Sequence, residues 1–232
     1  MSLLLDGIKE AVRMLFNGDY EVLYITWLTL RVCLTAISIS VVIGVPAGIF
    51  LGLKRFYGRR ILMIFVNLGM SLPPVVAGLI ITMTLWRSGP LGQWEWLYTP
   101  QAIVMAQVLV SLPIIIGLTS TAFQQIDHKM LWLVKSMGAN RIQKVMILLK
   151  QTKLAIVAAI MAGLGRVLAE VGAAMMVGGN LKGETRILTT SIVMEVSKGN
   201  FDIAIALSFI LMTLAFIITY LLTTIQQRNQ VS

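Results

Sequence analysis

The sequence predicts an all-α integral membrane protein, and three observations predict it. Of the 232 residues, 57% are hydrophobic and 12% are charged, about half the charged fraction of an average soluble domain. Five segments are long and apolar enough to cross a bilayer as helices, which takes about 20 residues each. Lysine and arginine are spread unequally over the connections between these segments. The length fits one compact bundle, with an amphipathic segment over residues 1–21, a transmembrane domain over 22–226 and a tail over 227–232.

The predicted spans cover residues 32–53, 61–86, 102–123, 154–177 and 203–225. Ahead of them, apolar residues recur at helical spacing: Leu4, Ile8, Val12 and Leu15. Residues 3–30 are therefore predicted to form a helix that leads into the first span, and two interpretations are open: it lies on the membrane as an interfacial helix, or it crosses it. This stretch does not resemble a signal peptide, because acidic residues interrupt it and no basic segment precedes a compact apolar core.

Two of the spans carry residues that shape helix packing. In the first span, Gly44, Gly48 and Gly52 form a ridge of small residues, which predicts close contact with a neighbouring helix. In the second span, Pro73 and Pro74 free backbone carbonyls and are expected to kink the helix. Such a kink is tolerated where the chain is buried in protein or lines a cavity. A simple packing kink and a role in lining a pore are both open interpretations.

The distribution of basic residues predicts the orientation in the membrane. The first connection, the connection between spans three and four and the C-terminal tail together hold eleven Lys or Arg against a single acidic residue, Asp127. The opposite side holds six basic and eight acidic residues. Basic connections stay in the cytoplasm, so the N-terminus is predicted outside and the C-terminus inside. Because topology accounts for the formal charge of +9, no nucleic-acid partner is expected.

The connection over residues 124–153 is too long for a simple hairpin and has apolar residues at helical spacing. Gly138 and Asn140 interrupt this pattern. Both residue types tolerate left-handed backbone, so the connection is predicted to be helix, turn, helix. Two interpretations are open: an amphipathic helix on the membrane surface, or a cytoplasmic docking element for another protein.

The fourth predicted span contains two charges, Arg166 and Glu170, which lie one helical turn apart on the same face. A charge at membrane depth is costly unless it faces protein, a partner charge or water. One interpretation is an ion pair that stabilises helix packing, and the other is a role at a gate or at a dimer interface. Arg31, near the outer end of the first span, is expected to extend toward the headgroups.

Residues for catalysis or metal binding are few. The chain has one cysteine, Cys33, and one histidine, His128, so neither an internal disulfide nor a Cys/His metal site is expected. Residues 178–183 have the glycine spacing of a phosphate-binding loop, but Glu184 stands where that loop requires lysine and no strand precedes it. We therefore expect no cofactor, no ATP binding and no enzymatic activity in this chain.

Two other classes of membrane protein fit the residues less well. A membrane-embedded enzyme is disfavoured because Glu170 is the only carboxylate deep in a predicted span and no second acid, His or Cys accompanies it. A stand-alone secondary transporter is disfavoured because the five spans show no internal repeat.

The connection at 124–153 resembles the ATPase-coupling loop of binding-protein-dependent ABC importer permeases, which has the pattern E-A-A-x-x-x-G-x9-I-x-L-P. The residues that match it are Trp132, Leu133 and Val134 at the E-A-A positions, Gly138 and Ala139 at the glycine and its follower, and Leu148 at the isoleucine. Arg141 falls within the same loop, whereas Lys150 and Gln151 stand where Leu and Pro are expected. The leading Glu and the trailing Leu-Pro are therefore departures from the pattern.

Two further segments extend this resemblance over nearly the whole chain. Ser71–Gly78 is similar to the oxyanion permeases for molybdate, tungstate and sulfate, and Gly165–Asn180 is most similar to the tungstate type. The resemblance implies a type I importer permease bundle of five or six spans in the prokaryotic plasma membrane. It also implies a path for an oxyanion, tungstate first, with molybdate or sulfate as the alternatives.

The resemblance implies partners and site residues as well. The permease is expected to work as a homodimer, with two copies of a cytoplasmic ATPase that hydrolyses ATP and with an extracytoplasmic substrate-binding protein. The residues expected to line the path or its gate are Pro73, Pro74, Gly178, Gly179 and Asn180.

Overall fold

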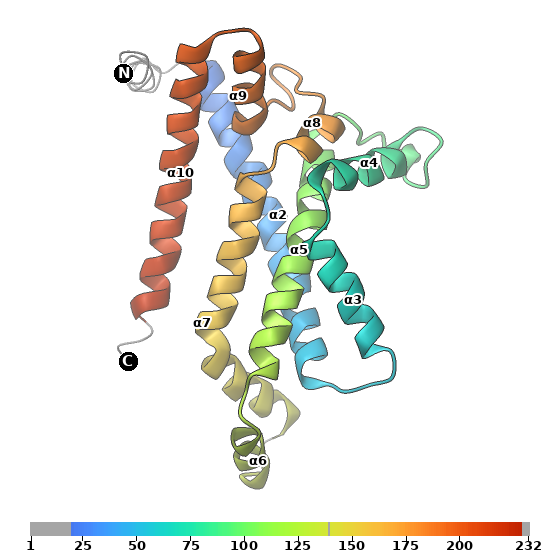
Figure 1. Cartoon of the computed structure of the whole chain (residues 1–232), viewed down its shortest axis with the longest axis vertical. Coiled ribbons are helices and arrows are strands. Elements are labelled where there is room, and N and C mark those ends of the chain that lie inside the picture. The colour runs from blue at the N-terminus through green and yellow to red at the C-terminus, as the bar shows by residue number, and fades with distance from the viewer. Residues whose placement is uncertain (1–19, 139, 229–232) are drawn as a thin grey trace.

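A computed structural model describes residues 20–138 and 140–228, and the regular elements of these residues are all helices (Figure 1). The α-helices are α2 (Tyr20–Leu53), α3 (Arg59–Met70), α4 (Pro74–Leu85), α5 (Pro100–Gln124), α6 (His128–Ser136), α7 (Arg141–Leu168), α8 (Gly172–Gly178), α9 (Leu188–Ser197) and α10 (Phe201–Arg228). A short 3-10 helix, η1 (Gly92–Trp94), lies between α4 and α5. Figure 1 shows α2, α5 and α7 side by side, with α10 on one flank and α3 and α4 on the other.

Within residues 20–138 and 140–228, four helices are long and apolar enough to cross a membrane: α2, α5, α7 and α10. The pair α3 and α4 passes the same test only when taken together, which gives the fifth span expected from the sequence. Helix α2 begins at Tyr20, so residues 20–30, for which interfacial and spanning positions were both open, are part of the first spanning helix. The rest of that segment, and the tail after residue 228, lie outside the described residues.

Two of the predicted spans are broken rather than continuous. The second turns by 106° between α3 and α4, which is a larger change of direction than the expected kink. The fourth was expected to run to residue 177, but α7 ends at Leu168 and the separate helix α8 begins at Gly172. We call residues 71–73 the first break and residues 169–171 the second break.

The seam between α2 and α5 is the most extensive helix contact in the bundle. A Cβ atom built on Gly48 would lie 2.6 Å from Thr119 Cβ, and one on Gly52 would lie 2.6 Å from Phe123 Cβ. Carbon atoms in contact normally stay about 3.5–4.0 Å apart. The prediction that this glycine ridge permits close helix packing is therefore confirmed.

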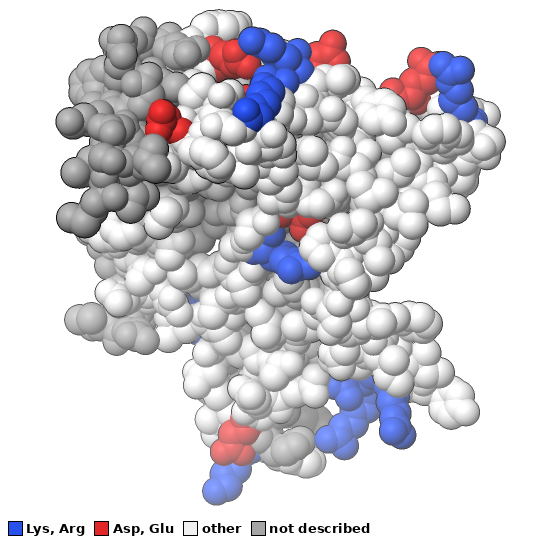
Figure 2. Space-filling model, turned by 45° about the horizontal axis from the view of Figure 1, so that its top comes forward, with Lys and Arg blue, Asp and Glu red and all other residues white. Residues whose placement is uncertain are grey.

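Charged residues gather at the two ends of the molecule. The connection between α2 and α3 lies at the same end as α6, and the connections around η1, α8 and α9 lie at the other end (Figure 1). In Figure 2 the first end carries mostly Lys and Arg, whereas the second carries both signs. The two groups of connections that the sequence assigns to opposite sides of the membrane are thus at opposite ends of the bundle.

Candidate functional site

The first break follows from the two prolines. A residue before proline is disfavoured in helical backbone, and Pro73 accordingly adopts an extended conformation (φ −61°, ψ 132°). Pro74 then occupies the first turn of α4, where the missing N–H costs nothing. The first break leaves the carbonyl of Leu72 without an intrahelical donor, and Nη2 of Arg166 donates to it at 3.2 Å.

The second break contains no proline, and two hydrogen bonds of Glu170 are formed there, one with α8 and one with α9. Oε1 of Glu170 accepts from the backbone N–H of Ala173 at 2.8 Å, in the first turn of α8. The carbonyl of Glu170 accepts from Oγ1 of Thr189, on α9, at 3.0 Å. The carboxylate and the carbonyl of Glu170 are therefore both occupied, and the residue is 2% exposed.

The two breaks lie against one another. A Cβ atom on Gly172 would lie 3.0 Å from Val75 Cγ2, and one on Gly78 would lie 2.8 Å from the backbone Cα of Ala173. Helices α4 and α8 are thus held in close contact beyond the two breaks. Irregular backbone at membrane depth is tolerated where it is buried in protein or lines a water-filled cavity, so this junction is the first candidate for a functional site.

The predicted ion pair between Arg166 and Glu170 is not formed in this conformation. The salt bridges among the described residues join Lys182 and Arg186 to Glu21, and Lys198 to Glu195. The prediction assumed a continuous helix, in which residues four apart face each other. Because α7 ends at Leu168, Arg166 instead contacts the first break and Glu170 contacts α8.

The outer end of α8 is the second candidate. Gly179 (φ +67°) and Asn180 (φ +52°) both adopt left-handed backbone, and a Cβ atom on Gly179 would lie 2.9 Å from the ring of Tyr98. The backbone N–H of Tyr98 also donates to the carbonyl of Val177 at 2.9 Å. Gly178 is buried, and Oδ1 of Asn180 is buried without a hydrogen-bond partner in the described part of the chain.

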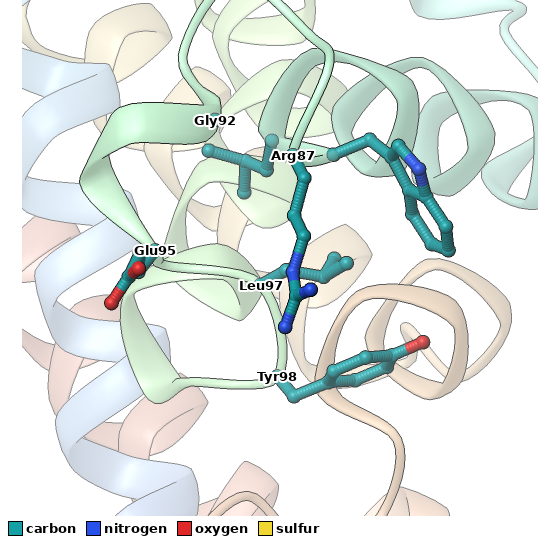
Figure 3. A pocket seen from close by; sticks show the side chains of 7 residues that line it. Arg87, Gly92, Glu95, Leu97 and Tyr98 are labelled. Carbon is teal, nitrogen blue, oxygen red and sulfur yellow. The ribbon is translucent and has the colours of Figure 1, made fainter.

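A cavity of about 520 Å³ lies beside this outer end, and its lining residues are Leu85, Trp86, Arg87, Gly92, Glu95, Leu97 and Tyr98. Figure 3 shows the Arg87 side chain extending toward the Tyr98 ring, while the Glu95 carboxylate points away from it. The cavity therefore offers a cation and an aromatic surface next to Gly179. Neither Arg87 nor Tyr98 was predicted from the sequence, although several Trp and Tyr follow the second span, as is typical of a membrane interface.

The third candidate is the α6–α7 hairpin, which comprises α6 and the start of α7 up to residue 153. Gly138 adopts φ +72°, and Asn140 caps α7 reciprocally with Gln143, at 2.8 and 2.9 Å. This confirms the predicted helix, turn, helix arrangement. The second helix of the hairpin is continuous with the fourth span rather than separate from it.

The hairpin residues that match the coupling-loop pattern divide into a buried group and an exposed group. Val134 and Leu148 are buried, at 3% and 0% exposure, whereas Trp132 and Leu133 are 68% and 61% exposed. A cavity of about 390 Å³ lies along the hairpin, lined by Val134, Met137, Gln143, Met146, Ile147 and Lys150. Ala139 lies outside the described residues, and Arg141 is the first residue of α7. The hairpin thus presents apolar side chains on its surface at the end rich in Lys and Arg.

Comparison with known proteins places these features in context. Residues 44–231 match the family model described as "Binding-protein-dependent transport system inner membrane component". The chain is 34% identical to the tungstate uptake system permease protein TupB of Peptoclostridium acidaminophilum, over 98% of this chain and 100% of that protein. It is also 34% identical to TupB of Campylobacter jejuni, over 93% and 90% of the two chains.

A solved structure has the same fold. It is titled "Inward facing conformations of the MetNI methionine ABC transporter", with a TM-score of 0.75, 20% identity, and coverage of 92% of this chain and 98% of the other. At this identity the likeness concerns the fold alone, and it extends over nearly all of both chains.

Proposed function

This chain belongs to the family of binding-protein-dependent transport system inner membrane components, and we propose that it forms the transmembrane path for tungstate in an ATP-driven importer. It is a membrane-embedded permease subunit and not itself an enzyme. The family implies an ATPase and a substrate-binding protein as partners. We choose tungstate as the cargo because the chain is 34% identical to the tungstate permease TupB over nearly its full length. Relatives named for molybdenum or sulfate transport share less identity.

We propose that the path runs along the surface of the bundle and is enclosed by a second copy of the chain. Apolar side chains from α2, α5 and α7 fill the interior of the bundle, among them Ile37, Ile115 and Leu164. A hydrated anion cannot cross such an interior, because an unpaired charge is very costly to bury. A homodimer would provide the missing wall of the path.

Within that path, the residues at the first break and at the outer end of α8 have the expected chemistry. Pro73 and Pro74 create the first break, and Gly178 and Gly179 bring the backbone close to neighbouring groups. The Asn180 side-chain amide has N–H donors that suit an anion, whereas its oxygen, buried without a partner in the described chain, can only accept. We assign these five residues to the path or its outer gate, since glycine and asparagine offer neutral polar groups that hold an anion weakly.

The α6–α7 hairpin is proposed to dock the ATPase. Trp132 and Leu133 are exposed, and exposed apolar side chains clustered at one end favour a protein contact. Buried Val134 and Leu148 hold the hairpin together behind that surface. A rigid hairpin continuous with α7 would carry a movement of the ATPase directly to the second break.

Uptake measurements test the substrate. Cells that carry or lack this gene would be supplied with labelled tungstate, molybdate or sulfate at nanomolar concentrations. We expect the deletion to abolish tungstate uptake, and plasmid-borne wild type to restore it. Loss of molybdate or sulfate uptake with tungstate uptake unchanged would reassign the cargo within the oxyanions. Loss of uptake of an amino acid alone would reject an oxyanion cargo.

Two glycine variants test the docking proposal. Val at position 138 is strained, because left-handed backbone disfavours β-branched residues. Gly58 (φ +93°) provides the matched control, since neither glycine has an atom within 4 Å of a built Cβ and Gly58 lies between α2 and α3. We expect Gly138→Val, but not Gly58→Val, to lower ATP hydrolysis stimulated by the binding protein. Equal hydrolysis in the two variants would contradict the proposed role of the hairpin.

A further inference from the structure

Arg166 has an unusual position for a charged residue. It lies in the last turn of α7, just before the second break, and it is partly buried. Its one hydrogen bond in the described chain is the Nη2 contact to the Leu72 carbonyl, a neutral acceptor at 3.2 Å. A guanidinium has five N–H donors. Most of its donors are therefore not used by the described residues.

Glu170 moderates this positive charge without occupying its donors. The Glu170 carboxylate is directed to the Ala173 N–H and is 2% exposed. Both side chains reach the junction of the two breaks, so their opposite charges offset each other in part without direct contact. The guanidinium is thus available to a ligand, yet the local net charge stays close to zero.

The surface beside Arg166 differs from the other exposed surfaces of the spanning helices. On the part of α7 that follows residue 153, the exposed positions carry small side chains: Ala155, Ala158, Ala162 and Gly165, followed by Ala169 at the second break. A Cβ atom on Gly165 would have no atom within 4 Å. By contrast, the exposed positions of α3 and α10 include Phe65 and Phe216, as a surface facing lipid would.

Charged atoms are visible in the middle of the molecule as well as at its ends. Figure 2 shows Lys or Arg atoms beside Asp or Glu atoms in a hollow at mid-height, away from the charged residues at both ends. A charge exposed at membrane depth faces water or protein rather than hydrocarbon. The α7 surface that borders Arg166 is therefore suited to be a wall of an aqueous space.

We propose that the Arg166 guanidinium is a transient contact for the oxyanion as it passes the two breaks. This inference rests on the proposed function and assigns a residue within it. A tetrahedral oxyanion presents pairs of oxygens that match the planar guanidinium fork. The anion competes with the Leu72 carbonyl for Nη2 and meets the nearby charge of Glu170. Both effects keep binding weak, which a conducting site requires because a tightly held ion cannot leave.

Charge-preserving and charge-removing variants test the contact. The reconstituted transporter would contain the permease, its ATPase and its binding protein. Arg166→Gln retains an N–H donor for Leu72 but loses the charge, whereas Arg166→Lys retains the charge. Arg31→Gln is the matched control, because it removes another arginine within a spanning helix, one that is exposed on α2.

We expect Arg166→Gln to lower tungstate uptake roughly tenfold or more, the effect of losing one charge-assisted hydrogen bond. Hydrolysis of ATP stimulated by the binding protein should persist, so that transport and hydrolysis separate. Arg166→Lys should recover part of the uptake, and Arg31→Gln should resemble wild type. Normal uptake in Arg166→Gln, or an equal loss of uptake in the Lys variant, would overturn the proposal.

Cysteine labelling provides a second measurement that leaves Arg166 intact. Gly165→Cys introduces a thiol into open space, and the natural Cys33 is 2% exposed and so gives little background. We expect a negatively charged, water-soluble thiol reagent to label the introduced thiol in the assembled Gly165→Cys transporter, and millimolar tungstate, molybdate or sulfate to slow the labelling. If the thiol is not labelled, or if no oxyanion slows its labelling, the proposed oxyanion contact at Arg166 is rejected. This outcome can be read even if the Arg166 variants fail to assemble.

The two proposals fail in different ways. If the wild-type transporter carries no oxyanion, the proposed function is rejected. If the wild type carries tungstate while Arg166→Gln does so equally well, only the role of Arg166 is rejected. Protection of the Gly165→Cys thiol by sulfate or molybdate alone would support an oxyanion contact and reject tungstate as the ion it serves.

Discussion

Close contact between α4 and α8 requires a glycine at position 78, and Gly78→Ala tests this requirement. The added methyl would lie 2.8 Å from the Cα of Ala173 and 3.2 Å from the Cβ of Met176. The Cα atom belongs to the backbone of α8 and cannot rotate away. The two helices must therefore move apart by several tenths of an ångström, which disturbs the junction between the two breaks.

The size of the effect follows from a matched comparison with Gly165→Ala. Both glycines lie inside helices, so the gain in helix propensity on replacement by alanine, about 1 kcal/mol, is common to both variants. A Cβ on Gly165 meets no atom within 4 Å. The difference between the variants then isolates the overpacking cost, which we expect to be about 1–3 kcal/mol.

Thermal unfolding of the two purified variants in detergent measures this difference. At about 2–4 °C per kcal/mol for a chain of this size, Gly78→Ala should unfold about 2–12 °C below Gly165→Ala. Oxyanion uptake should fall in the first variant, because the junction is displaced. Equal melting temperatures would show that α4 and α8 are not packed as closely as the structure has them, and would refute the reasoning.

Three further predictions concern hydrogen-bonded polar groups. Glu170→Ala removes the acceptor of the Ala173 N–H and should lower the free energy of unfolding by about 1.5–3 kcal/mol. Glu170→Gln keeps an acceptor and should lower it less. Denaturant titration of both variants measures the difference. Asn140→Ala removes the cap of α7 and should cost about 1 kcal/mol while lowering stimulated ATP hydrolysis. Hydrogen bonds from Asn200 and then Lys198 lower the pKa of Glu195 below its usual value of 4.5. The stabilisation is therefore complete above that value and is lost as the pH falls below it, and Asn200→Ala should flatten this pH dependence of the melting temperature.

The continuous spans could be predicted because each is marked by an apolar run of neighbouring residues. Helices α2, α5 and α10 each carry a long apolar run, and their observed bounds contain the predicted spans. The extra length of α2 was missed because Tyr20–Leu30 includes polar residues, which favoured an interfacial segment. The position of the first break could be predicted, since the proline pair marks it. The angle between α3 and α4 could not, because residue types alone do not determine it.

The second break was not predictable from local sequence in the same way. No proline marks it, and the donor to the Glu170 carbonyl is Thr189 on α9, a residue distant in the chain. The expected ion pair failed for the same reason, because residue spacing implies a helix that does not continue past Leu168. The outer cavity was missed because Glu95 and Tyr98 adopt left-handed backbone, which the sequence does not indicate, and because Tyr98 is placed by a hydrogen bond to the distant Val177.

Three backbone groups at the two breaks are each hydrogen-bonded by a side chain, and this bears on how the site can move. The Leu72 carbonyl accepts from Arg166, the Glu170 carbonyl accepts from Thr189, and the Ala173 N–H donates to Glu170. If the junction separates, the two carbonyls must accept from water and the Ala173 N–H must donate to water or to an anion, because an unpaired buried polar group is costly. Opening of this junction is therefore favourable only when water can enter it, with or without the transported anion. The contacts that hold the breaks closed thus make their opening depend on a hydrated path.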